Sequence, residues 1–186
     1  MSGPERQATG FDGERRLLSG ALIDVALALK AATAAGAEGP LLAFDEATGA
    51  VIDLDLRGSR SDIAARLAAG AAPRGRGRPK LGVAAREVTL LPRHWEWLAE
   101  QPGGASAALR RLVEAARRTG ADENRARLAQ EAAYRFMAAM AGDLPGFEEA
   151  TRALFAPDRA RFERHVAAWP NDVRAYAARL AEPALA

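Results

Sequence analysis

Apolar residues alternate with polar ones in the first part of the chain and recur at helical spacing in the last part. Val51–Leu56 has an apolar residue at every second position, separated by Asp53 and Asp55, which is typical of a strand with one buried and one wet face. Leu41–Phe44 is predicted to be a second strand, joined to the first through a turn at residues 45–49.

The N-terminal part of the chain combines such strands with helices. Phe11–Leu18 is predicted to be a strand with a turn at Asp12-Gly13, and residues 1–10 are expected to be disordered. A helix from position 19 or 20 to about Ala35 follows, and a shorter helix is expected over Asp62–Ala69. Residues 1–70 are therefore predicted to form a small α+β domain.

The pattern changes after residue 70. Residues 71–82 form a basic segment too rich in Gly and Pro for a helix or a strand. Residues 83–120 predict an extended strand over Val83–Leu91, a helix opened by Pro92, a glycine turn, and a second helix that starts at Ser106. The second helix repeats apolar residues at the spacing of one helix face (Leu109, Leu112, Val113 and Ala116).

Residues 121–186 are predicted to form a separate, all-helical domain. A long helix over Asp122–Ala141 is followed by three shorter ones, with Pro157 and Pro170 between them. Aromatic residues recur at seven-residue intervals (Phe155, Phe162, Trp169 and Tyr176). Because the prolines interrupt that run, packing between short antiparallel helices is favoured over a coiled coil. The predicted fold class is α+β and mainly helical.

The charge of the chain is concentrated in its middle. Residues 73–118 hold ten Arg or Lys against four acids, a net charge of +6, and the whole chain has a net charge of +2. The remaining residues therefore carry −4, an asymmetry typical of a surface that binds a polyanion. The preference for Arg over Lys also fits a GC-rich genome, so composition alone does not establish binding.

The centre of the basic segment resembles an AT-hook, a short motif that lies extended in the minor groove of A·T-rich DNA. The resemblance rests on five consecutive residues (Arg76, Gly77, Arg78, Pro79 and Lys80). Gly permits close approach of the backbone, Pro keeps the chain extended, and Arg is attracted to narrow minor grooves. A solvated linker, or an RNA-binding Arg-Gly segment, would carry a similar sequence.

Residues 86–118 resemble a ribbon-helix-helix domain, in which two chains pair their strands and the helices form the dimer core. The resemblance implies a homodimer with Arg86, Thr89 and Arg93 near the major groove or its phosphates, and with Ser106 at a helix N-terminus that faces a phosphate. In the usual register Val88 and Leu90 would face the DNA. We therefore expect a bulge, or pairing on the other face, that buries both residues. An ordinary helical hairpin with an edge strand is the alternative.

The whole chain resembles a bacterial family known as domain of unknown function DUF2239. Three passages carry the resemblance: Gly77–Val83, Arg86–Trp95 and Ala141–Ala150. The family implies no activity.

Signals for catalysis are poor. His94 and His165 lie on separate predicted helices, neither with a second ligand at metal-binding spacing. Ser106 lacks the Gly-x-Ser-x-Gly elbow and is explained as a helix cap. The sequence contains no Cys, hence no disulfide or thiol chemistry. We expect no enzyme, no cofactor and no metal.

The sequence thus predicts a DNA-binding homodimer, as a transcriptional regulator or a nucleoid-associated factor. The alternative is a protein-interaction adaptor whose strand and helices serve only oligomerisation. No apolar run reaches the length of a membrane span and no secretion signal is present, so a cytoplasmic location is expected.

Overall fold

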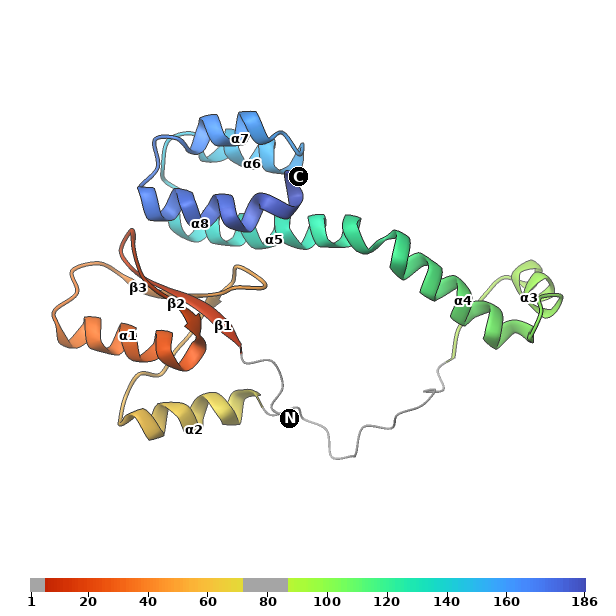
Figure 1. Ribbon diagram of the computed structural model, residues 1–186, viewed down its shortest axis with the longest axis horizontal. Helices are drawn as coiled ribbons and strands as arrows, with labels where there is room; N and C mark the ends of the chain where they lie inside the picture. The colour runs from red at the N-terminus through yellow and green to blue at the C-terminus, as the bar shows by residue number, and fades with distance from the viewer. Residues whose placement is uncertain (1–5, 72–86) are drawn as a thin grey trace. The chain divides into compact units, whose positions relative to one another are not determined.

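The computed structural model describes residues 6–71 and 87–186. The chain forms two compact units (Figure 1). One comprises Met1–Ala72 together with Arg125–Ala186, and the other comprises Pro73–Asn124.

A four-stranded antiparallel sheet lies in the first unit. Its strands are β1 (Gln7–Asp12), β2 (Arg15–Ala21), β3 (Leu41–Asp45) and β4 (Val51–Ile52), in the order β2-β1-β3-β4. The first two form a hairpin whose register shifts between Gly10 and Phe11. Leu41–Phe44 and the start of Val51–Leu56 are strands as predicted, although β4 ends four residues before the predicted limit. The predicted strand Phe11–Leu18 instead spans the end of β1, the hairpin turn and most of β2. Because β2 continues to Ala21, the helix that follows begins at Leu22 and not at position 19 or 20.

The expected disorder of residues 1–10 is wrong for Gln7 onwards. Ala8, Thr9 and Gly10 are buried between two neighbouring strands, although none has a large apolar side chain. A central strand gains ladder hydrogen bonds on both edges, and this contribution does not depend on hydrophobicity. The sequence pattern was too weakly apolar to reveal it.

Helix α1 (Leu22–Ala34) covers one face of the sheet, and α2 (Arg60–Ala71) packs against α1. Small residues on that face let the helix approach closely: a Cβ on Gly10 would lie 3.1 Å from Val25 Cγ1. Ile63 of α2 is buried, and Leu67 packs against the cluster formed by α1 and the sheet. This layer corresponds to the predicted N-terminal α+β unit.

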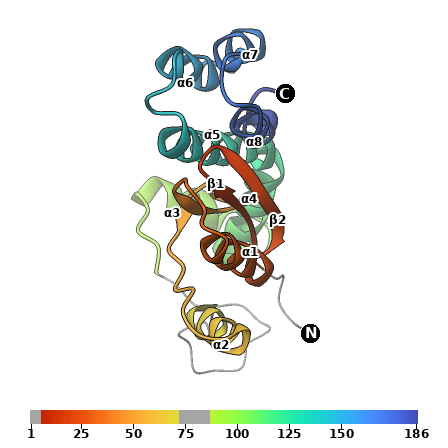
Figure 2. The same ribbon diagram turned by 90° about the vertical axis from the view of Figure 1, so that its left-hand side faces the viewer.

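The opposite face of the sheet is covered by helices from the other end of the chain, as Figures 1 and 2 show. Phe11 of β1 and Phe44 of β3 contact Phe136 of α5 (Ala121–Met140) and share a core with Tyr176 of α8 (Asn171–Ala181). Ring centroids are 4.6 Å apart for Phe136–Tyr176 and 5.5 Å for Phe11–Tyr176. The N-terminal strands and the C-terminal helices were predicted to belong to different domains, but in the structure they share one hydrophobic core.

The remaining C-terminal helices are short, as the proline positions indicated. They are α6 (Phe147–Phe155), α7 (Arg159–Val166) and the 3-10 turn η1 (Glu182–Ala184). Three of the four periodic aromatics are buried, and Trp169 donates its indole N–H to the Pro145 carbonyl at 2.9 Å. Phe155 is half exposed and stacks edge-on against Tyr134.

The second unit contains α3 (Pro92–Ala99) and α4 (Gly104–Thr119). Pro92 occupies the first turn of α3, where its missing N–H costs nothing. Helix α4 begins two residues earlier than predicted, because Gly103 adopts φ +84° as its N-cap. Residues 87–91 form no strand, so the predicted strand is not observed over the part of it that the structure describes.

Candidate functional site

The predicted DNA-binding residues fall partly outside the described part of the chain. This applies to the AT-hook-like segment (Arg76, Gly77, Arg78, Pro79 and Lys80) and to Arg86. Thr89, just before α3, and Arg93, at its start, are both exposed. Ser106 is exposed in the first turn of α4 and is not the helix cap, a correction to the prediction.

The most unusual feature of the α3–α4 pair is how little of it is buried. Of the side chains described between Glu87 and Asn124, only Leu98 and Ala108 are buried. The large apolar side chains around them are between 41% and 57% exposed (Val88, Leu91, Trp95, Trp97, Leu112 and Val113). We call this set the α3–α4 apolar face. A pair of short helices with so small a core needs further apolar contacts to be stable.

The exposure of Val88 bears on the expected register of the extended segment. Val88 is 53% exposed and Leu90 is half-buried. Leu91, the N-cap of α3, has the extended dihedrals φ −67° and ψ 149°. Since a strand needs a partner for its backbone groups, burial of Val88 in a ribbon would require a second chain.

The polar side of α4 carries four arginines in two pairs seven residues apart. Arg110 donates to the Ser106 carbonyl at 3.2 Å and Arg111 to the Pro102 carbonyl at 2.9 Å. Arg117 and Arg118 form exposed ion pairs with Glu114 at 3.4 and 3.9 Å. Exposed pairs of this kind contribute little to stability. All four guanidinium groups belong to exposed residues, so their positive charge lies at the surface of this helix.

Sequence reasoning missed a buried polar network in the first unit. Thr9 of β1, which is fully buried, hydrogen-bonds Ser19 of β2 at 2.7 Å between the hydroxyl oxygens and donates to the Glu46 carboxylate. Tyr176 donates its hydroxyl to Glu46 Oε1 at 3.3 Å, and Arg179 pairs with Glu46 Oε2. The five residues come from four separate segments and form no short motif.

The protonation state of Tyr176 follows from its surroundings in this network. Burial raises the pKa of Tyr176 to about 12, and the negative charge of Glu46 acts in the same direction. Tyr176 therefore stays a hydrogen-bond donor at neutral pH. The oxygens of the Glu46 side chain accept from Thr9 and Tyr176 and pair with Arg179.

The two histidines lie in different units of the chain. His94 is exposed on α3 and His165 is half-buried on α7. Within residues 6–71 and 87–186, no group of three His, Asp or Glu side chains could hold a metal ion. None of the helices described there is both long enough and apolar enough to span a membrane.

The fold defines a mainly helical α+β protein whose small antiparallel sheet lies between N- and C-terminal helices. The chain belongs to the family described as "Uncharacterized protein conserved in bacteria (DUF2239)", which matches residues 7–181. No curated protein and no solved structure matches it.

Proposed function

We propose that the protein is a homodimeric, sequence-tolerant or A·T-biased DNA-binding protein that acts as a transcriptional regulator or nucleoid-associated factor. The observation that carries the proposal is the α3–α4 apolar face within the most basic stretch of the chain. The apolar face supports self-association, and the charge supports a polyanionic ligand.

Burial of exposed apolar side chains favours a second chain. Complete burial of a Val, Leu or aromatic side chain contributes about 1.5–3 kcal/mol relative to full exposure. The six side chains of the α3–α4 apolar face are roughly half exposed. Covering even part of this set on a second copy would thus contribute several kcal/mol, and the second copy would give the extended segment 87–91 a partner strand.

The positive charge of residues 73–118 and the sequence of residues 76–80 support DNA as the ligand. Arg76, Arg78 and Lys80 would enter the minor groove, with Gly77 and Pro79 keeping the backbone extended. Arg86, Thr89 and Arg93 would lie near the major groove or its phosphates. The first turn of α4 at Ser106 would offer backbone N–H groups to a phosphate.

A salt-titrated binding assay on A·T-rich and G·C-rich duplexes tests the DNA proposal. Arg78→Ala should lower affinity and narrow the difference between the two duplexes, since Arg78 is at the centre of the groove-binding sequence. Each phosphate contact that is lost should reduce the log–log salt slope by about 0.9. Arg74→Ala, outside that centre, should weaken both duplexes alike. If both variants bind as the parent does, with an unchanged slope, the DNA proposal fails.

Light scattering at micromolar concentration tests the dimer, and two leucines of equal exposure provide matched variants. Leu112 on α4 is 48% exposed and Leu128 on α5 is 47% exposed. Leu112→Gln should shift the protein from twice the chain mass towards the monomer, whereas Leu128→Gln should not. A parent protein that is monomeric under these conditions would exclude the dimer.

The second candidate is a protein-interaction adaptor, supported by the same apolar face. A dimer that binds neither duplex at low salt would favour the adaptor over the DNA-binding protein.

A further inference from the structure

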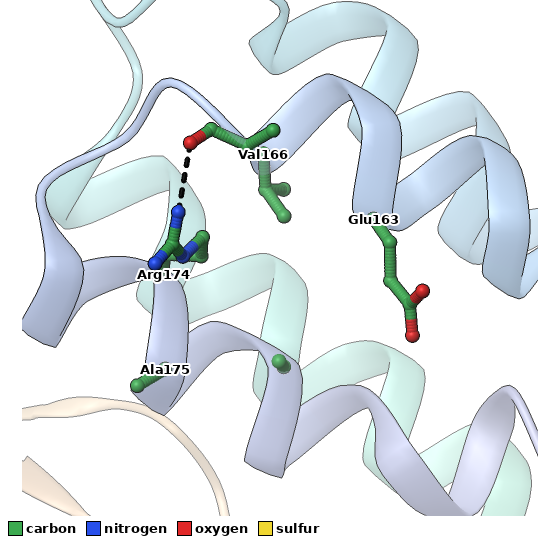
Figure 3. Close-up of a pocket in the computed structure, with 6 residues that line it drawn as sticks. Glu163, Val166, Arg174 and Ala175 are labelled. Carbon is green, nitrogen blue, oxygen red and sulfur yellow. Dashed lines mark hydrogen bonds between the residues drawn. The ribbon is translucent and has the colours of Figure 1, made fainter.

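Two surface hollows in the first unit differ in how their charged side chains are held. The hollow shown in Figure 3 has a volume of about 340 Å³ and lies between α7 and α8, with Glu163 and Arg174 on its wall. Arg174 donates to the Ala167 carbonyl at 2.8 Å and to Asn171 Oδ1 at 3.0 Å. Its guanidinium therefore secures the connection between the two helices, and Glu163 pairs with Arg159 at 3.7 Å, so both charged groups of this hollow serve contacts within the protein.

The second hollow, about 250 Å³ in volume, lies where α5 and α8 meet the turn after β3. Its polar side holds Arg125, Arg179 and Glu46. The rest of its lining is mainly apolar (Ala47, Leu128, Ala129, Ala132, Leu180 and Pro183). We propose that this hollow binds a small organic monocarboxylate that carries a short apolar chain or ring.

Arg179 is held in place in the lining of this hollow. Its side chain is 47% exposed, and its guanidinium lies 4.5 Å from the ring centroid of Tyr176 while it pairs with Glu46 Oε2. Tyr176 is fully buried and the Glu46 side chain is 19% exposed. The stacking and the ion pair hold one face and one edge of the guanidinium, so this cation is pre-oriented at the surface.

Hydrogen bonds from Thr9 and Tyr176 hold Glu46 in place. Burying a carboxylate with Thr9 and Tyr176 contributes little to stability, because desolvation offsets the gain from the new hydrogen bonds. Replacement of a buried charged group and its partners by apolar residues of similar size is often neutral or stabilising. The specific consequence of the network is that Glu46, and through it Arg179, has one orientation.

The guanidinium of Arg179 has the geometry to bind a carboxylate. A guanidinium has five N–H donors in a planar fork that fits a carboxylate in two parallel hydrogen bonds. Among the described residues, Arg179 has no other ion pair or hydrogen bond than its contact with Glu46. The remaining donors are thus available to a ligand.

Charge and size define the ligand class. The remaining N–H donors of Arg179 define the charged part of the ligand, because one such fork pairs with one carboxylate. The Glu46 carboxylate already accepts from Thr9, Tyr176 and Arg179. The volume is below the range of about 300–1,000 Å³ typical of drug-sized ligands. The apolar lining, including the half-exposed Leu128, would contact the hydrocarbon part of the acid.

NMR titration of the full-length protein with butyrate and benzoate tests the proposal, with butyramide and benzamide as uncharged controls. The acids should shift the backbone amide signals of Ala129 and Ala132 in a saturable way, and the amides should not. A ligand of about six heavy atoms is expected to have a millimolar dissociation constant. Absence of saturable shifts up to roughly 50 mM acid would overturn the proposal, as would equal binding of the amides.

Variants separate the positioned cation from general attraction to a basic protein. Arg179→Gln should weaken butyrate binding by about tenfold or more, because a charged hydrogen bond is removed. Arg152→Gln is the matched control, since Arg152 is an exposed arginine on α6 paired with Glu148 and Glu149. Equal losses in both variants would contradict the site.

Two further variants act without removing the cation. Tyr176→Phe keeps the ring under Arg179 but removes one donor to Glu46, so it should weaken butyrate binding several-fold. Leu128→Ala should weaken benzoate more than acetate, because it removes apolar contact area. Unchanged affinity in both variants would refute the role of the network and of the apolar lining. None of these outcomes depends on whether the protein binds DNA.

Discussion

Replacing Gly49 by Ala tests how closely the sheet packs on α5. Gly49 lies in the turn between β3 and β4, is buried, and has φ +63°. A Cβ at this position would lie 2.0 Å from the backbone oxygen of Ala132 on α5. Real Cβ atoms do not approach closer than 3.0 Å, so the turn and the helix must separate by the difference, 1.0 Å.

Gly36→Ala is the matched control, since Gly36 has φ +79° but no atom within 4 Å of an added Cβ. Both substitutions place an L-residue in the left-handed region, which costs about 1–2 kcal/mol. Only Gly49→Ala adds overpacking, typically about 1–3 kcal/mol. The shift also strains the hydrogen bond from Arg135 to the Thr48 carbonyl, which is 3.1 Å long.

We therefore expect losses in the free energy of unfolding of about 1–2 kcal/mol for Gly36→Ala and about 2–5 kcal/mol for Gly49→Ala. Urea unfolding followed by far-UV circular dichroism measures both, and similar m-values would show that the same unit unfolds. Equal destabilisation by the two variants would refute the close approach of the turn to α5, and with it the shared core.

Two further predictions concern the core and one buried carboxylate. Phe136→Ala should lower the free energy of unfolding by about 3–5 kcal/mol, because this fully buried ring contacts three other aromatic rings. Hydrogen exchange should show that β1 and α8 lose protection together. Protection retained in β1 alone would contradict a common core. Burial tends to raise the pKa of Asp45, but hydrogen bonds from Arg6 and Thr48 outweigh it and hold that pKa below its ordinary value. Asp45→Asn should therefore destabilise the protein at pH 7. Urea unfolding should show that the difference in unfolding free energy between variant and parent shrinks as the pH falls through the folded-state pKa of Asp45, below about 4. A difference that grows in acid would contradict the lowered pKa.

The local elements could be predicted from the sequence where one residue type dominates the backbone. Pro92 opens α3, and α6, α7 and α8 are separated at Pro157 and Pro170 as expected. Asp53 and Asp55 are exposed while Leu54 and Leu56 are half-buried, so the alternation predicted the exposed side correctly even beyond the end of β4. Periodicity and proline act within a few residues, which is why they can be read from a single sequence.

Tertiary structure decided which segments share a core and which polar groups meet. Phe11 and Phe136 are 125 positions apart in the sequence but their ring centroids are 5.6 Å apart. Local periodicity shows that each residue is buried and not against which partner. The same holds for Thr9, Glu46, Tyr176 and Arg179, whose carboxylate–donor contacts exist only once β1, the turn after β3 and α8 are packed together. The α3–α4 apolar face is the converse case: periodicity predicted its helices, and the three-dimensional arrangement revealed that this chain leaves their apolar side half exposed.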